Sequence, residues 1–84
     1  MKITNTKQLS AYLKDLRLDD GLSQTDVARK VGIRQDTVSS FELRPDATKM
    51  ETFFKLLSAL DLDIEITPRN PEHVNDASDW KEEW

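Results

Sequence analysis

The sequence contains no cysteine among its 84 residues, and it has only two glycines, three prolines and one histidine. Without cysteine, neither a disulfide framework nor a thiolate metal site is available, which suits a reducing cytoplasm. No apolar run approaches the roughly 20 residues that a membrane-spanning helix needs, and the N-terminus lacks the charged-then-apolar profile of an export signal. We therefore expect one small cytoplasmic domain with no membrane partner.

Residues with catalytic chemistry are also scarce. His73, the single histidine, lies in a polar acidic stretch and has neither a metal-ligand set nor a triad partner. The serines lack an activating base, and no glycine-rich loop suggests a phosphate cradle. The sequence predicts a binding protein that is not an enzyme and that needs no cofactor and no metal.

What the chain does contain is a pattern of two short helices joined by a tight turn, between residues 23 and 41. Ser23 is a helix-capping residue, and Asp26 three positions later gives a carboxylate variant of the capping box. Gly32 lies where the chain reverses and where a left-handed backbone costs glycine little. Apolar residues at helical spacing form the inner side of both helices and the turn: Val27, Ala28, Val31, Ile33, Val38 and Phe41. The pattern predicts a helix-turn-helix, the unit that sets its second helix into the DNA major groove.

The second helix supplies the candidate DNA contacts. Val38 and Phe41 point inward, so the polar residues around them are the candidates for the groove: Arg34, Gln35, Asp36, Thr37, Ser39 and Ser40. Glutamine pairs in two places with adenine, and arginine with guanine. Gln24 opens the preceding helix, where it can meet a phosphate while bracing Gln35. Weaker candidates would contact phosphates only or play an ordinary solvated role: Ser23, Thr25, Arg29, Lys49 and Lys55.

Charge divides unevenly along the chain. Residues 1–60 carry ten basic and eight acidic residues, a balance of +2, whereas residues 61–84 carry eight acidic and two basic residues, a balance of −6. The small excess of the first part predicts weak binding to arbitrary DNA, which a second subunit would strengthen. Asp36 is repelled by phosphates, although it could accept from cytosine N4. The alternative is that it lies in the first turn of its helix, where the dipole favours an acid.

Two further helices are expected around this unit, which makes the fold all-α and compact with four to five helices. Thr6 is the expected cap of the first, which stops near Gly21 and carries inward Leu9, Tyr12, Leu13 and Leu16. Thr48 and Glu51 are expected to form a capping box for the last, which carries inward Phe53, Leu56, Leu57 and Leu60.

After the last helix the apolar period changes from 3.6 to 2, with Leu62, Ile64 and Ile66 on one face. This alternation predicts a half-buried strand. A lone strand leaves its hydrogen-bonding groups unpaired, and residues 2–4 are the only other strand candidate. We expect the strand to pair with its own copy across a two-fold axis, in a homodimer. The alternative is a helix tail packed on its own core.

The composition shifts again after residue 67, the expected end of the helix-turn-helix domain. Residues 68–84 contain two prolines, five acids and little apolar content, which predicts a disordered tail. Trp80 and Trp84 stand in this tail, and tryptophan is enriched at binding hot spots. We expect them to contact a protein partner; the alternative is a tail that packs back on its own domain.

These motifs together resemble the Xre/Cro-type helix-turn-helix family and, within it, the HipB-type antitoxins. The resemblance runs from about Thr6 to Thr67 and returns in Glu83-Trp84 at the end. It is carried by Gly21–Gln35, Thr37–Ser39, Phe41-Glu42 and Thr52–Lys55, together with the strand after the last helix. The chain departs from the family pattern at Asp36, at Ser40 and through most of the tail.

The resemblance implies a homodimer joined partly by a two-stranded intersubunit sheet, which binds palindromic operator DNA and represses its own operon. It also implies a complex with a HipA-like serine/threonine kinase, whose activity is neutralised. On matching positions, Arg34, Gln35 and Ser39 would read bases with support from Gln24 and Thr37, and Trp84 would anchor the kinase. Two other functions stay open: a stand-alone repressor with an incidental tail, and an interaction module that no longer binds DNA.

Overall fold

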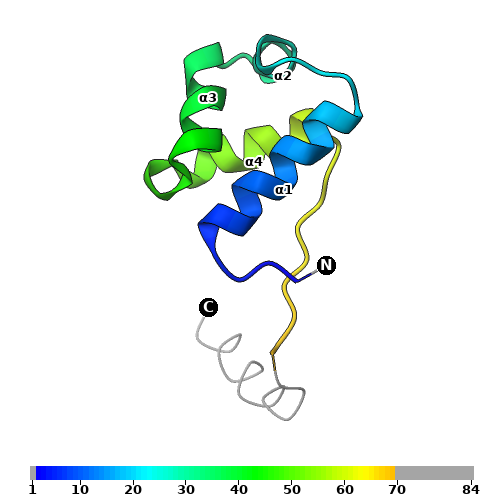
Figure 1. Cartoon of the computed structure of the whole chain (residues 1–84), viewed down its shortest axis with the longest axis vertical. Helices are drawn as coiled ribbons and strands as arrows, with labels where there is room; N and C mark the ends of the chain where they lie inside the picture. Colours follow the sequence, from blue (N-terminus) through cyan, green and yellow to red (C-terminus); the bar gives the residue numbers. More distant parts are fainter. Residues whose placement is uncertain (1, 70–84) are drawn as a thin grey trace.

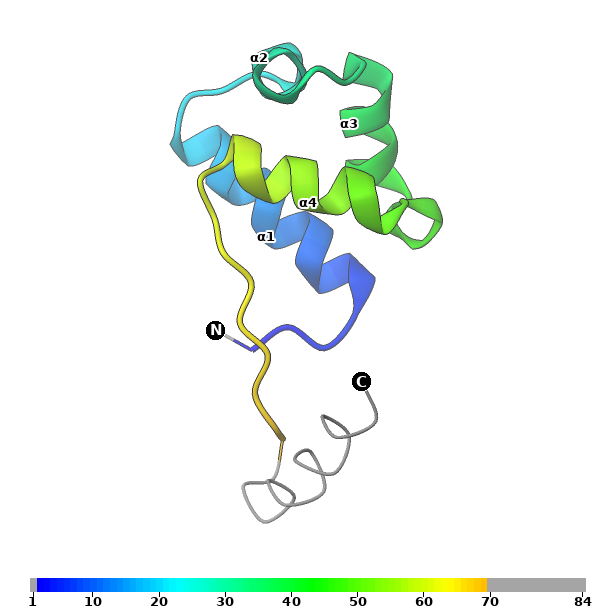
Figure 2. The ribbon, with the colours of Figure 1, turned by 180° about the vertical axis from the view of Figure 1, so that it is seen from behind.

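The computed structural model describes residues 2–69, and this part of the chain folds into four short α-helices (Figure 1). They are α1 (Thr6–Asp19), α2 (Gln24–Val31), α3 (Gln35–Leu43) and α4 (Met50–Ala59), with a 3-10 turn η1 (Pro45–Ala47) before α4. Helices α1 and α4 cross the middle of the molecule, while α2 and α3 lie at one end (Figures 1 and 2). The all-helical expectation is confirmed. None of these helices is long and apolar enough to cross a membrane.

Helix α1 begins at Thr6, one residue earlier than a cap at Thr6 requires, so that expectation is wrong. The cap is Asn5, whose side chain accepts a 2.8 Å hydrogen bond from the Gln8 backbone N–H, and asparagine is among the strongest N-cap residues. The Thr6 hydroxyl instead donates to the carboxylate of Asp46 in η1, which ties the start of α1 to the 3-10 turn. At the other end, Gly21 takes the predicted left-handed conformation, with φ of 72°.

The predicted capping box at the start of α4 is also wrong. Lys49 is the N-cap and makes no side-chain cap hydrogen bond. Thr48 closes η1 instead, because its backbone N–H donates to the Pro45 carbonyl at 3.1 Å. A capping box needs the acid three residues after the cap, and Glu51 follows the actual cap by only two.

The hydrophobic core draws on all four helices. The expected stripe of α1 contributes one fully buried residue, Leu13, while Leu9 and Leu16 pack at its edge and Tyr12 is only half-buried. The other helices deliver most of the residues that the periodicity predicted, and the core consists of Leu13, Val27, Ala28, Val38, Phe41, Phe53, Leu56, Leu57, Ala59 and Leu60. Burial of such side chains contributes about 1.5–3 kcal/mol each for the larger ones, and it fixes the orientation of α3.

Beyond α4 the chain turns at Asp61, a non-glycine residue with φ of 59°, and then runs extended. Leu62 packs against the core, and its N–H donates to the Leu57 carbonyl at 2.9 Å. Residues 63–69 make no backbone hydrogen bond to any other part of the described chain. The expected strand is therefore not formed within residues 2–69, because an extended segment becomes a strand only when another strand pairs with it. The predicted tail contacts of Trp80 and Trp84 lie outside the described residues.

Candidate nucleic-acid interface

The entry to α2 is built by the predicted capping box. The Ser23 side chain accepts from the Asp26 N–H at 3.0 Å, and the Asp26 carboxylate accepts from the Ser23 N–H at 2.9 Å. The hydrogen bond that the Ser23 backbone N–H donates to the carboxylate is the largest cause that lowers the pKa of Asp26, followed by the Ser23 side chain and by the charges of Arg29 and Lys30. The first turn of α2 is thereby fixed with both capping partners satisfied.

The turn between α2 and α3 depends on Gly32, which caps α2 in the left-handed conformation with φ of 69°. The next N–H, of Ile33, donates to the Ala28 carbonyl at 3.0 Å and closes the turn. No atom would obstruct a side chain at Gly32, so the positive φ is the reason for glycine at this position. Buried Ala28 and Val27 then pack on the inner face of α3, at Val38 and Phe41.

With that inner face buried, the predicted groove residues occupy the N-cap, the first turn and the outer side of α3. Arg34 is the N-cap without a side-chain cap bond, and Gln35, Asp36 and Ser40 are exposed. Thr37 and Ser39 are half-buried. The structure therefore places the whole predicted set on or beside the exposed face of α3. Arg34, Gln35 and Asp36 lie at the N-terminal end of this helix.

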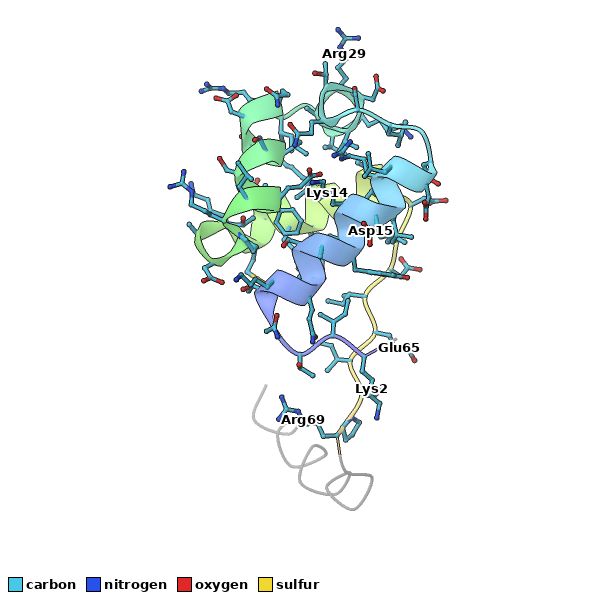
Figure 3. The ribbon with its side chains drawn as sticks, viewed as in Figure 1. Lys2, Lys14, Asp15, Arg29, Glu65 and Arg69 are labelled. Carbon is cyan, nitrogen blue, oxygen red and sulfur yellow. The ribbon has the colours of Figure 1, made fainter. Side chains whose placement is uncertain are left out.

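The predicted phosphate contacts are more scattered. Ser23, Thr25 and Arg29 are exposed along the start and outer side of α2, where Arg29 points away from the body (Figure 3). Lys49 is exposed at the start of α4, and Lys55 is engaged 3.5 Å from Glu51. Helix α2 thus offers the phosphate candidates that lie next to α3 in the fold.

Arg34 and Asp36 form an ion pair on the outer face, with 2.6 Å between Nη2 and Oδ2. Their side chains are 81% and 65% exposed, and such a pair contributes at most about 1 kcal/mol to stability. Asp36 also lies in the first turn of α3, the place that the dipole argument favoured. The negative charge of Asp36, which DNA phosphates would repel, is thus partly neutralised by Arg34.

The expected contact between Gln24 and Gln35 is present. The Gln35 Nε2 donates to the Gln24 Oε1 at 2.6 Å, and this joins the start of α2 to the start of α3. On its other side, the Gln24 Nε2 donates to the Glu42 carboxylate at 2.9 Å. Gln24 therefore bridges a buried residue and an exposed one.

Glu42 forms a buried ion pair with Arg17, which the sequence did not lead us to expect. Arg17 donates twice to its carboxylate, at 2.7 and 3.0 Å, and once to the Leu22 carbonyl at 2.8 Å. The side chains of Arg17 and Glu42 are only 8% and 7% exposed. A signal was present: Arg17 stands four residues after Leu13 and so falls on the buried face of α1, where an unpaired charge would be costly.

The buried carboxylate is held in its ionised form. Burial alone would raise the pKa of Glu42, but the hydrogen bonds from Arg17 and Gln24 and the charges of Arg17 and Lys14 outweigh burial, so the pKa lies below its ordinary value. Lys14 projects from α1, the same helix as Arg17 (Figure 3). Within residues 2–69, every buried side-chain nitrogen and oxygen has a hydrogen-bond partner.

A four-helix body in which a capped α2 and a glycine turn present an exposed polar α3 defines a helix-turn-helix protein. A helix-turn-helix family model, HTH_3, matches residues 13–66. Antitoxin HipB of Escherichia coli strain K12 is 38% identical over 80 residues, which cover 88% of this chain and 91% of that protein. The chain therefore belongs to the helix-turn-helix family and, within it, to the HipB-type antitoxins.

Solved structures show the same relationship. The HipB chain of a HipA-HipB-O2-O3 complex superposes with a TM-score of 0.81 and 38% identity, over 83% of this chain and 99% of that one. A HipB-O4 20mer complex gives the same score, identity and coverage. The predicted family is thus confirmed by both sequence and structure.

Proposed function

We propose that this protein is the antitoxin of a HipBA-type toxin-antitoxin module, without enzymatic activity of its own. As a homodimer in the cytoplasm it binds palindromic operator DNA and represses its own operon, and it binds and neutralises a HipA-like serine/threonine kinase. Support comes from family membership and from the HipB relatives solved with HipA and O2-O3 and with an O4 20mer. The observation that carries the DNA-binding half is the exposed polar face of α3, braced by the bond from Gln35 to Gln24.

The reading set is Arg34, Gln35 and Ser39, supported by Gln24 and Thr37. Arg34, Gln35 and Thr37 lie at the N-terminal end of α3, the end that usually reaches base edges, while Ser39 lies in the middle of α3 and Gln24 opens α2. Phosphate contacts from α2 orient the helix without reading bases. The test is salt-dependent binding to the palindromic DNA upstream of the gene, compared with a shuffled duplex. Gln35→Ala should lose about 1–3 kcal/mol on the operator, and equal affinity of the wild type for both duplexes would refute operator binding.

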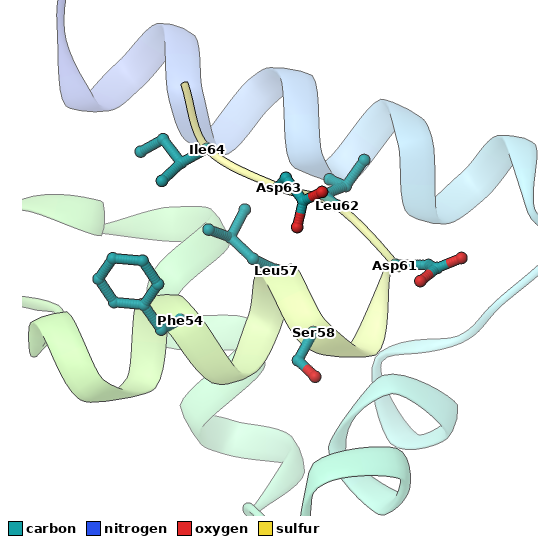
Figure 4. Close-up of a pocket in the computed structure, with 7 residues that line it drawn as sticks. All are labelled: Phe54, Leu57, Ser58, Asp61, Leu62, Asp63 and Ile64. Carbon is teal, nitrogen blue, oxygen red and sulfur yellow. The ribbon is translucent and has the colours of Figure 1, made fainter. Parts of the chain in front are cut away.

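The dimer is proposed from the segment after α4. A groove of about 450 Å³ lies between α4 and this segment (Figure 4). Its lining is apolar at Phe54, Leu57, Leu62 and Ile64 and polar at Ser58, Asp61 and Asp63. Phe54 and Ile64 are each 49% exposed, and Ile66 is 88% exposed. A second copy laid antiparallel along Leu62 to Ile66 would pair the free backbone groups and cover this apolar surface.

Ile64→Lys tests the dimer, because a buried unpaired lysine would oppose association. We expect the variant to sediment as a monomer with its helical content unchanged. Glu65→Lys is the matched control, since the alternation places Glu65 on the opposite face of the segment. An Ile64→Lys protein that sediments like the wild type would rule out this interface.

The kinase half of the proposal rests on the family and on the terminal Glu83-Trp84, which resembles the end of HipB. Co-purification from the native host identifies the partner, and a kinase gene adjacent to this one distinguishes an antitoxin from a stand-alone repressor. Removal of Trp84 should weaken the kinase complex and leave operator affinity unchanged. If both affinities fall together, the indole supports the fold and does not anchor the kinase.

A further inference from the structure

A continuous line of hydrogen bonds joins the core to the outer face of α3. Arg17 donates to Glu42, Gln24 donates to Glu42, and Gln35 donates to Gln24. We infer that Glu42 is a positioning residue that determines which atom of the Gln35 amide faces the DNA. The inference rests on the proposed operator binding and adds the base that Gln35 selects, which is adenine over guanine.

The first step is the orientation of Gln24. An ionised carboxylate only accepts hydrogen bonds, so Gln24 must turn its NH₂ group toward Glu42, as it does at 2.9 Å. The opposite orientation would place the amide oxygen against a carboxylate oxygen with no proton between them. Because the two polar atoms of an amide lie on opposite sides of its carbon, the Gln24 oxygen then faces Gln35.

In the second step, the orientation of the Gln24 amide determines the orientation of the Gln35 amide. The oxygen of Gln24 needs a donor, and the Gln35 Nε2 supplies it at 2.6 Å. The Gln35 carbonyl oxygen is thereby turned away from α2, while the second hydrogen on Nε2 remains free. In the major groove adenine offers a donor at N6 and an acceptor at N7, which match this oxygen and this hydrogen. Guanine offers two acceptors, and its O6 would oppose the oxygen.

The third step concerns the anchor. An exposed glutamine alone would exchange its amide orientation freely, and nothing would favour one base. The Glu42 side chain is 7% exposed, and Arg17 donates to both of its carboxylate oxygens, so the far end of the line is held in place. Orienting a reading group before binding lowers the cost of ordering it on the DNA. The buried pair therefore contributes to base choice as well as to stability.

The experiment measures the affinity ratio for operators with adenine or guanine at the base pair whose preference Gln35→Ala abolishes. Wild type should prefer adenine by about tenfold, within the discrimination of one bidentate pair. Glu42→Gln introduces an NH₂ group that can donate to Gln24, which reverses both amides. We expect its ratio to fall to about one or to invert, with thermal stability measured separately. A ratio that stays at the wild-type value while both affinities drop would overturn the inference.

Gln24→Met gives the same test without touching the Arg17–Glu42 pair, and it decides the matter if Glu42→Gln does not fold. Its ratio should fall about fivefold or more, because Gln35 loses its orienting partner. Asp26→Asn is the matched control, a carboxylate-to-amide change that weakens the capping box of α2 outside the line of hydrogen bonds. It should lower stability and keep the adenine preference. Wild type that binds no operator refutes the proposed function; wild type that binds but does not distinguish the two bases refutes only the positioning role.

Discussion

Among residues 2–69, arginine and a carboxylate pair twice, once between α1 and α3 and once at the start of α3. The Arg17–Glu42 distance is 2.7 Å and the Arg34–Asp36 distance is 2.6 Å. The first pair is less than a tenth exposed and the second is mostly exposed. Attraction between charges at a given distance is several times weaker near water than in the interior. Burial, and not distance, therefore separates a pair that supports the fold from a pair that shapes a binding surface.

The partners of the two pairs differ in the same way. Glu42 accepts from Arg17 and Gln24, and Arg17 also donates to Leu22, so the buried charges have several partners. The exposed pair shares one hydrogen bond between its own two residues. Removal of one member of the Arg17–Glu42 pair should accordingly leave a buried, unpaired charge, whereas removal of one member of the Arg34–Asp36 pair leaves a charge in contact with water.

The largest effect is expected from Arg17→Met. The variant leaves Glu42 buried without its counter-charge, and the free energy of unfolding should fall by about 3–5 kcal/mol in urea denaturation. That loss is a large part of the roughly 5–15 kcal/mol of a typical domain. The control is the double variant Arg17→Met with Glu42→Leu, which replaces both charges with apolar groups and should recover most of the loss. If single and double variants are equally unstable, the two residues are not coupled.

Acid should weaken the buried pair and leave the double variant less affected. The pKa of Glu42 is lower in the folded protein than its ordinary value of 4.5. Its stabilising contribution is thus complete above about pH 4.5 and is lost as the pH falls through the folded value. Unfolding free energies at a series of pH values from 7 to 3 should show wild type losing more stability than the double variant. The capping carboxylate Asp26 is present in both proteins, so its own lowered pKa cancels in this difference. Parallel curves would contradict a role for Glu42.

The sequence predicted the local features of this fold, but it did not predict the contacts between residues that are distant in the chain. The turn around Gly32 and the cap at Ser23 were predictable because their signals are local, and the exposed face of α3 followed from two inward residues. The Arg17–Glu42 contact joins residues 25 apart in the chain, and helical spacing places each on a face without naming its partner. The bond from Gln24 to Glu42 was missed for the same reason.

The wrong expectations have related causes. Thr6 and Thr48 have suitable side chains for caps, but neighbouring structure uses them otherwise: Asp46 takes the hydroxyl of Thr6, and η1 takes the N–H of Thr48. The strand at Leu62 to Ile66 depends on a second segment to pair with, and alternation in one chain cannot supply it. Local chemistry sets the elements of this fold, and contacts distant in sequence set where they start and what they meet.

The smallest effect on stability, and the one that separates the pairs most sharply, is expected from Asp36→Ala. Both members of the exposed pair are solvated, so the unfolding free energy should change by less than about 1 kcal/mol. The affinity for DNA, by contrast, should rise, because the Asp36 carboxylate no longer faces the phosphates and Arg34 no longer pairs with it. Affinity for a duplex without operator sequence should rise about fivefold, as expected for roughly 1 kcal/mol between unit charges in water. Fluorescence anisotropy at several salt concentrations measures both the gain in affinity and the salt slope, which should steepen if Arg34 gains a phosphate contact.

Ser40→Ala is the control on the same exposed face of α3, because it removes a polar group without changing the charge. A loss of DNA affinity in Asp36→Ala would show instead that the carboxylate itself contacts a base, with cytosine N4 as the group that it would accept from.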